Sequence, residues 1–276
     1  MTPEQTKAAR DLLAFYAEAG VQDLVGEVPV NHFADPAIPA TADAAEPRAD
    51  VSTDTRQATD TEPRPQPAAP NQIAPLTPEA AVMAAREAAA RAQSLDELRD
   101  LLVGFHGCAL RQTARQLVFA DGNPEARVMF VGEAPGREED LEGLPFVGPS
   151  GKLLNLMLNA IGLTRESAYI ANVIPWRPPG NRTPTPQETA ICLPFIARQI
   201  ALADPDVLVC MGGPASQTLL NLKDGIRKTR GRWLTYHTGA REIRALPTFH
   251  PAYLLRTPLE KRSAWRDLLA IKKALG

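Results

Sequence analysis

An apolar run joined to a glycine- and proline-rich turn, Arg127-Val128-Met129-Phe130-Val131-Gly132-Glu133-Ala134-Pro135-Gly136, indicates the fold class. Such a run is typical of a strand buried on both faces of a parallel sheet, followed by a tight loop. Similar strands are predicted at residues 168–174, 206–211 and 243–249. Between the strands, helical spacing recurs at residues 151–161, 186–203, 214–222 and 259–275. This alternation predicts an α/β fold, a three-layer α/β/α sandwich around a central, mainly parallel four-stranded sheet.

The first hundred residues differ from the rest in charge and composition. They hold 8 basic and 17 acidic side chains, whereas the remaining residues hold 22 basic and 15 acidic ones. The basic surplus suits a body that binds a polyanion, although an ordinary solvated face explains it equally well. The composition predicts an N-terminal helix at residues 1–25, a disordered linker rich in Pro and Ala at 26–76, and a folded domain at 77–276 with a helical lead-in at 77–104.

The three cysteines, Cys108, Cys192 and Cys210, are too few and too scattered for a secreted disulfide framework. The sequence starts without a signal-peptide pattern, and no stretch reaches the ~18 apolar residues of a membrane span. We therefore expect a cytoplasmic, nucleoid-associated protein that does not contact a membrane.

Ligands of parallel sheets bind beyond the carboxyl ends of the strands, and three predicted loops meet there, at residues 132–136, 175–182 and 250–256. The first loop places Glu133 on a glycine-rich turn, which alone indicates no more than a tight turn. It lacks the Lys and Ser/Thr of a phosphate-binding loop. A nucleotide-dependent enzyme on the same sheet is therefore the least favoured function.

Residues 144–151 place Phe146 on a loop that leads into a helix N-terminus. Phe146 is suited to stack on a planar base, while Ser150 and the helix amides that begin at Gly151 are suited to hold a DNA phosphate. The alternative is a core phenylalanine followed by an ordinary serine cap.

Asn172 lies late in the apolar strand at 168–174 and needs polar partners there. Its amide acceptor and donors match the N3–H and O4 groups of uracil and mismatch cytosine. A structural asparagine that satisfies loop backbone is an equal alternative.

His250 follows the last strand, at the same edge of the sheet. Cleavage of an N-glycosidic bond builds negative charge on the base and positive charge on the sugar, so a donor at the base and an anion near the sugar stabilise the transition state. His250 and Glu133 suit these roles. The following side chains form a wedge that suits the gap left by a flipped nucleotide, namely Tyr253, Leu254, Leu255 and Arg256.

In their order and spacing, these segments resemble family 4 uracil-DNA glycosylases over about residues 108–275. The resemblance rests on residues 132–136, 139–140, 143, 145–148, 172, 177–182 and 250–256. It implies an α/β/α fold, a uracil pocket, and single- or double-stranded uracil-containing DNA as the partner. It assigns uracil stacking to Phe146, amide recognition to Asn172 and leaving-group stabilisation to His250, and it implies that Glu133 and the backbone at Ala134 help place the attacking water. It implies DNA contacts at Ser150, Gly151, Arg182, Tyr253, Leu254, Leu255 and Arg256.

The expected activity is monofunctional hydrolysis, because no lysine is poised for Schiff-base chemistry and the nearest, Lys152, lies in a helix's first turn. The alternative is a binding module that recognises uracil or abasic DNA with little turnover. We expect a monomer whose N-terminal helix docks on a protein partner or on the body itself.

One departure concerns a cofactor. Family 4 enzymes usually bind a four-iron four-sulfur cluster through four cysteines, and Cys108 and Cys192 stand at two of the four positions. Phe105 and Trp176 occupy the other two. Because a cluster needs four thiolates or close substitutes, we expect no cofactor and apolar packing at Phe105 and Trp176. A cluster held by Cys108, Cys192 and substitutes is the alternative.

Overall fold

The computed structural model describes residues 77–276, so the predicted N-terminal helix and linker lie outside the described residues. The described part begins with two helices, α2 (Pro78–Arg91) and α3 (Leu95–Gly104). Both pack against the long helix α7 (Pro186–Ala203) and extend one helical layer of the body. No helix in this part of the chain is long and apolar enough to cross a bilayer.

The central sheet has six strands in the order β1-β3-β2-β4-β6-β5. They are β1 (Asp121–Gly122), β2 (Val128–Gly132), β3 (Tyr169–Asn172), β4 (Val207–Met211), β5 (Leu234–His237) and β6 (Glu242–Thr248). The inner four, β3, β2, β4 and β6, are parallel and correspond to the four predicted strands. The predicted count of four was incomplete, because β1 and β5 add antiparallel edges. Strand β1 has only two residues and β5 alternates half-buried with exposed side chains, so neither shows the apolar run that marks a buried strand.

The remaining helices are α4 (Leu110–Thr113), α5 (Arg137–Glu142), α6 (Pro149–Ala160), α8 (Gly213–Leu220), α9 (Ile226–Thr229), α10 (Pro251–Arg256) and α11 (Lys261–Leu275), with short 3-10 helices η1 (Arg165–Ser167), η2 (Pro179–Asn181) and η3 (Pro258–Glu260).

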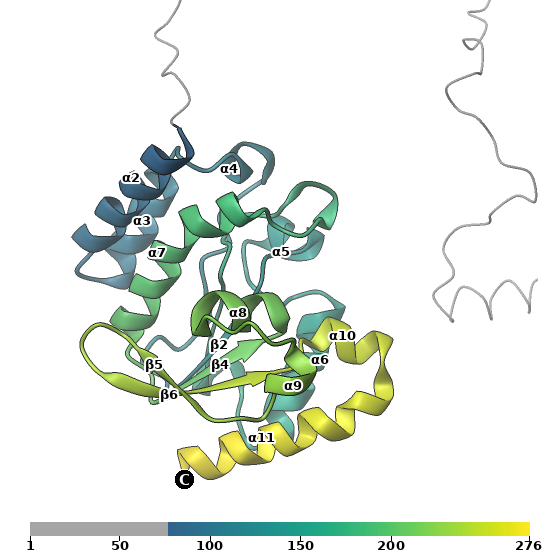
Figure 1. Cartoon of the computed structure of the whole chain (residues 1–276). Coiled ribbons are helices and arrows are strands. Elements are labelled where there is room, and N and C mark those ends of the chain that lie inside the picture. The colour runs from purple at the N-terminus through teal and green to yellow at the C-terminus, as the bar shows by residue number, and fades with distance from the viewer. Residues whose placement is uncertain (1–76) are drawn as a thin grey trace, which may run out of the picture. The chain divides into compact units, whose positions relative to one another are not determined.

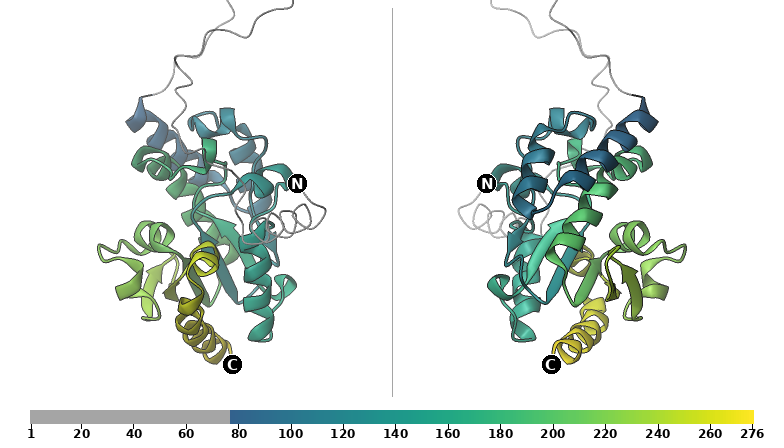
Figure 2. Two further views of the ribbon diagram at one scale, coloured as in Figure 1. Left: turned by 90° about the vertical axis from the view of Figure 1, so that its right-hand side faces the viewer. Right: turned by 90° about the vertical axis from the view of Figure 1, so that its left-hand side faces the viewer.

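The sheet separates two apolar cores, as alternating side chains of β2 show. Met129 and Val131 pack in the core that includes α2, α3, α7 and α8, whereas Val128 and Phe130 pack in the core that includes α6, α10 and α11. Helices α7 and α8 lie on one side of the sheet and α11 on the other (Figure 1), and the lead-in helices and α11 lie at opposite ends of the folded body (Figure 2). The α/β/α sandwich is confirmed.

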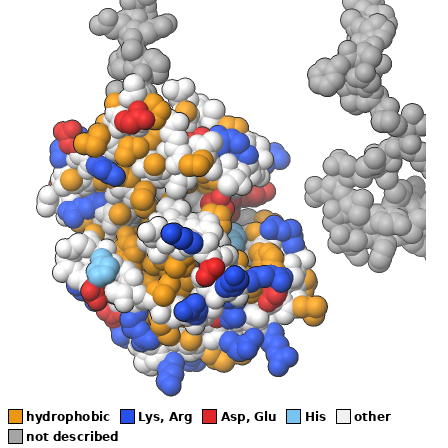
Figure 3. Space-filling view, viewed as in Figure 1, with side chains coloured by type: hydrophobic (Ala, Val, Ile, Leu, Met, Phe, Trp, Pro, Cys, Tyr) orange, Lys and Arg blue, Asp and Glu red, His pale blue; other side chains and the backbone are white. Residues whose placement is uncertain are grey.

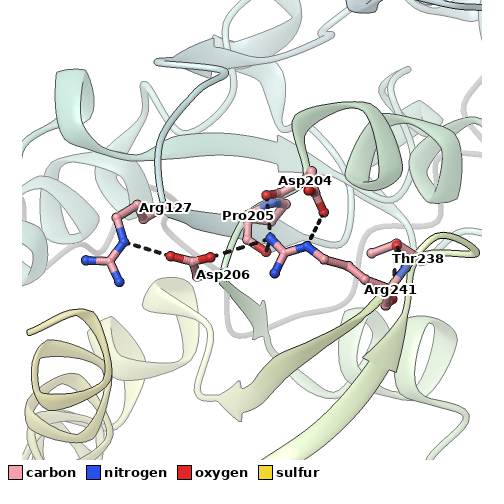
Figure 4. A network of polar contacts seen from close by, with 6 residues as sticks. All are labelled: Arg127, Asp204, Pro205, Asp206, Thr238 and Arg241. Atoms are coloured by element: carbon pink, nitrogen blue, oxygen red, sulfur yellow. Dashed lines mark hydrogen bonds and ion pairs between the residues drawn. The ribbon is translucent and has the colours of Figure 1, made fainter.

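Ion pairs link residues just before the amino ends of β2, β4 and β6 (Figure 4). Arg127 pairs with Asp206 at 2.7 Å, and Arg241 pairs with Asp204 at 2.6 Å. The Arg127 guanidinium, and then Arg241, hold the pKa of Asp206 below its ordinary value. Each exposed pair contributes little stability. The acids at this edge are thus paired with arginines, and the described cavities lie elsewhere.

A close backbone contact fixes the loop before α6. Phe146 adopts a left-handed conformation with φ of 57°, and helix α6 turns back directly onto it. A Cβ built at Gly151 would lie 1.6 Å from the Phe146 carbonyl oxygen. Because that neighbour is backbone and cannot swing aside, only glycine fits at this position in the first turn of α6.

We expect Gly151→Ala to lower the free energy of unfolding by about 2 kcal/mol or more, because the helix and the Phe146 loop must separate to admit the methyl group. Chemical denaturation of the full chain measures this. Gly104→Ala is the matched control, since a Cβ at Gly104 meets nothing within 4 Å and alanine favours the helix. Equal stability of the two variants would contradict the contact.

Candidate active site

A cavity of about 590 Å³ lies at the carboxyl ends of the parallel strands. The loops after β2 and before α6, the end of β3, the loop around η2, and the starts of α8 and α10 all contribute to its walls. Nine predicted site residues line it, namely Glu133, Ala134, Phe146, Ser150, Asn172, Arg182, His250, Tyr253 and Arg256. The predicted aromatic, amide and imidazole groups therefore share one cavity.

Gly132, at the end of β2, brings the aromatic and amide groups together. A Cβ at this position would lie 2.5 Å from both the Asn172 Oδ1 and the Phe146 Cζ. The centroid of the Phe146 ring lies 5.4 Å from the centroid of the His250 ring, and the two ring planes are inclined by 33°. A side chain at Gly132 would therefore displace the Asn172 amide or the Phe146 ring.

Asn172 carries an unpaired polar atom. The residue is 5% exposed and pairs with Gly132 across the β2–β3 ladder. Its Oδ1 is buried and has no hydrogen-bond partner among the described residues. An unsatisfied buried acceptor costs about 1–3 kcal/mol, which a ligand N–H that reaches it would offset. The amide therefore favours a ligand that presents a donor.

His250 caps helix α10, and this fixes its tautomer. Its Nδ1 accepts a hydrogen bond from the Ala252 N–H at 3.1 Å, so the ring proton sits on Nε2. Burial, and secondarily the positive charge of Arg256, lower the pKa of His250 to about 4. At neutral pH the residue is thus an uncharged imidazole whose Nε2–H is its hydrogen-bond donor.

Glu133 follows β2 and is half-buried in the cavity wall. Burial raises the pKa of this carboxyl above its ordinary value. A carboxylate with a raised pKa accepts a proton more readily than a surface glutamate does, which suits a group that orients or deprotonates water.

Glu139 joins the two loops that carry Glu133 and Phe146. Its carboxylate accepts hydrogen bonds from the backbone N–H groups of Gly136 at 3.0 Å, Val147 at 3.1 Å and Gly148 at 3.0 Å. In the sequence, Glu139 appears only as part of a motif. Its position three residues after Gly136, at the start of α5, signals a helix cap. The bonds to Val147 and Gly148 have no local signal.

The rim of the cavity holds cationic and aromatic side chains. The Arg182 guanidinium donates two hydrogen bonds, of 2.8 and 2.6 Å, to the Glu188 carboxylate. Arg227 donates a hydrogen bond to the Tyr253 hydroxyl at 2.7 Å. No motif in the sequence predicts this contact. Lys and Arg side chains gather over the region of α9, α10 and α11 (Figure 3).

Three residues expected to contact DNA do not line the cavity. Gly151 is buried beneath the Phe146 loop, where its role is to permit close packing. Leu254 is 1% exposed and packs in the core beneath α10, so it anchors the helix and is not part of an exposed wedge. Leu255, at 43% exposure, is the accessible leucine of the predicted pair.

Cys108 and Cys192 meet in the core on the α7 side of the sheet. Both are buried, and a hydrogen bond between their thiols lowers the pKa of Cys108 and raises that of Cys192. Phe105 packs edge-on against Phe195 at 5.0 Å between ring centroids, and Trp176 is 2% exposed in the same core. Among residues 77–276, no group of three or more His, Cys, Asp or Glu side chains is placed to hold a metal ion.

Comparisons with known proteins agree with this geometry. A family model described as "Uracil DNA glycosylase superfamily" matches residues 119–269. A type-4 uracil-DNA glycosylase of Archaeoglobus fulgidus is 39% identical over 188 residues, which is 67% of this chain and 94% of the relative. Enzymes of the same name are 37% identical in Saccharolobus solfataricus, over 66% of this chain and 87% of the relative, and 45% identical in Thermotoga maritima, over 54% and 77%.

We expect the His250 imidazole to titrate with a midpoint of about 4 in a proton NMR titration, with the resonance assigned by its loss in His250→Gln. Unfolded chains take up this proton near 6.5, whereas the folded protein does not do so until about pH 4. The His250 contribution to stability is therefore unchanged above about pH 7 and is lost as the pH falls, by about 3 kcal/mol at pH 4. A midpoint at or above 6.5 would contradict the buried neutral ring.

Proposed function

The chain belongs to the uracil-DNA glycosylase superfamily, and on this premise we propose that it removes uracil from DNA by hydrolysing the N-glycosidic bond and leaves an abasic site. The observation that carries the proposal is that Phe146, Asn172 and His250 line one cavity, and that the buried Asn172 Oδ1 has no hydrogen-bond partner among the described residues.

Base recognition falls to Phe146 and Asn172. A uracil extruded from the helix would stack on the Phe146 ring, its N3–H would donate to the Asn172 Oδ1, and its O4 would accept from the Asn172 amide. Cytosine presents an acceptor at N3 and an amino group at C4, so it would leave Oδ1 unpaired and place two donors together. The pairing therefore selects uracil.

His250 stabilises the leaving base. As the C1′–N1 bond breaks, negative charge develops on uracil O2, where a neutral Nε2–H can donate without first being charged. The depressed pKa leaves the ring without a positive charge to transfer at neutral pH. His250 is therefore an electrostatic donor in this mechanism, and the uracil anion takes its proton from solvent.

Glu133 completes the hydrolysis. A water molecule bonds to C1′ through its oxygen, and its proton passes to the Glu133 carboxylate. The same negative charge favours the positive sugar that develops as the base departs. Among the cavity-lining residues there is no lysine, which supports a monofunctional hydrolase without Schiff-base chemistry.

DNA contacts belong to the rim of the cavity. Arg182 and Arg256 supply positive charge for phosphates, and the amino end of α6 at Ser150 supplies backbone amides. Tyr253, which lines the cavity, and Leu255, which is exposed, would enter the space left by the flipped nucleotide. Single- and double-stranded DNA both suit such a surface, and a monomer suffices because one chain carries all these groups.

The cysteine site does not fit a four-iron four-sulfur cluster. Among residues 77–276, no third candidate ligand joins the two thiols, and the aromatic rings of Phe105 and Trp176 lie buried in the same core. The cluster that the resemblance leads one to expect is therefore absent from this proposal, and apolar packing takes its structural place.

A binding module with little turnover is the second candidate, since a well-formed pocket can retain its product. The placement of Glu133 beside the base-binding groups favours hydrolysis over retention.

We expect the full chain to release free uracil from an oligonucleotide with one uracil, and we expect hot alkali to cleave the product at the abasic site. His250→Ala and Asn172→Ala should each lower the single-turnover rate by about 10²–10³-fold, because each removes a hydrogen bond that strengthens in the transition state. His237→Ala is the control, since His237 lies in the edge strand β5 with a 71% exposed side chain. An oligonucleotide left intact by the wild-type protein would refute the proposal.

We expect protein purified without oxygen to contain no stoichiometric iron or sulfide and to lack visible absorption. The double variant Phe105→Cys/Trp176→Cys should gain both after reconstitution, because it supplies the two missing thiols. Phe105→Ala/Trp176→Ala is the matched control and should gain neither. Stoichiometric iron and sulfide in the wild-type protein would overturn this part of the proposal.

A further inference from the structure

A second, smaller cavity of about 60 Å³ lies beside Glu133, which lines it. Its walls come from the residues after β3, from the first turn of α7 and from the first two turns of α8, including Val173, Ile174, Thr189, Ala215 and Thr218. It adjoins the main cavity, because Glu133, Thr183, Pro184 and Pro214 line both. Glu133 therefore lies at the junction of a space large enough for a base and a space too small for one.

The size and lining of the small cavity suit water. A buried water needs roughly 10–15 Å³ of such space and two to four polar partners, so this volume holds several molecules. Three threonines line it, Thr183, Thr189 and Thr218, together with Glu133. The Thr189 hydroxyl donates to the Thr185 carbonyl at 3.1 Å, which leaves Thr183 and Thr218 as the hydroxyls available to hold water.

Hydrolysis creates a need for such a space. An extruded nucleotide would fill the main cavity and the DNA would cover its rim, so the attacking water must be held where neither displaces it. The small cavity lies on the side of Glu133 toward α7 and α8, whereas Phe146, Ser150, Tyr253 and Arg256 at the main cavity are absent from its walls. Water held there would remain beside the carboxylate when the nucleotide is bound.

We propose that this small cavity is the water reservoir of the reaction, and that Thr218 and Thr183 are positioning residues that hold the nucleophilic water against Glu133. One water oxygen bonds to C1′ as the C1′–N1 bond breaks, the pair of electrons leaves on uracil, and the water proton passes to Glu133. Water in the small cavity then carries that proton to solvent past Thr183, which is exposed. This inference rests on the proposed uracil excision.

The test uses the full chain and variants that separate shape from polarity. Thr218→Val replaces the hydroxyl with a methyl group of similar size, whereas Thr218→Ser keeps the hydroxyl. We expect Thr218→Val to lower the single-turnover excision rate at least tenfold while affinity for DNA with a non-cleavable uracil analogue stays unchanged. Thr218→Ser should stay within about threefold of the wild-type rate. Thr183→Val, on an exposed loop, should lower the rate in the same way without a change in thermal stability.

A second readout follows the nucleophile itself. In dilute methanol, we expect Thr218→Ala to yield a larger fraction of methyl glycoside, relative to abasic product, than the wild-type protein does, because a wider reservoir admits methanol. A structural role for Thr218 would not change this ratio. Wild-type excision combined with unaltered rates in both valine variants and an unaltered ratio in Thr218→Ala would overturn the reservoir and leave the proposed function intact. Failure of the wild-type protein to release uracil would instead overturn the function.

Discussion

The site depends on how closely the Phe146 loop approaches its neighbours. The backbone of Phe146 lies against Gly151, and its ring lies against Gly132, at separations that a single methyl group at either glycine would prevent. These two contacts place the ring between the end of β3 and the start of α10. Because Asn172 and His250 project from those elements, packing that involves no polar interaction sets the distance between the polar groups.

The polar groups of the site are satisfied on the protein side and left free on the cavity side. Glu139 uses both carboxylate oxygens on backbone amides, and His250 uses Nδ1 on the Ala252 amide. Each bond holds its residue in place, and the bond to Nδ1 also fixes the tautomer of His250. What remains for a ligand is an acceptor on Asn172, a donor on His250 and a carboxylate on Glu133, an arrangement prepared before a base arrives.

The sequence was sufficient to predict the parallel strands and the convergence of their loops, because buried strands are continuous apolar runs and ligands gather at their carboxyl ends. It was insufficient where the signal is not local. Strand β5 has no apolar run, the bonds of Glu139 to Val147 and Gly148 span a loop, and Arg227 meets Tyr253 across 26 residues. Leu254 and Leu255 are identical in type, so their opposite burial depends on how α10 sits on the core. Residues from four separate segments line the small cavity beside Glu133, and no spacing rule relates these segments.

The packing around Trp176 links the cysteine site to the active site. Trp176 is buried in the core with Phe105, Cys108 and Cys192, and the loop that follows it carries Arg182 to the cavity rim. Helix α7 contributes to both sites. Its Cys192 lies in the core, and its Glu188, one turn earlier, accepts a hydrogen bond from the Arg182 guanidinium. An apolar core tolerates no void and an ion pair of this geometry fixes orientation, so the two together specify the position of the loop. The loop is therefore positioned by side-chain packing on one side and by the Arg182–Glu188 ion pair on the other.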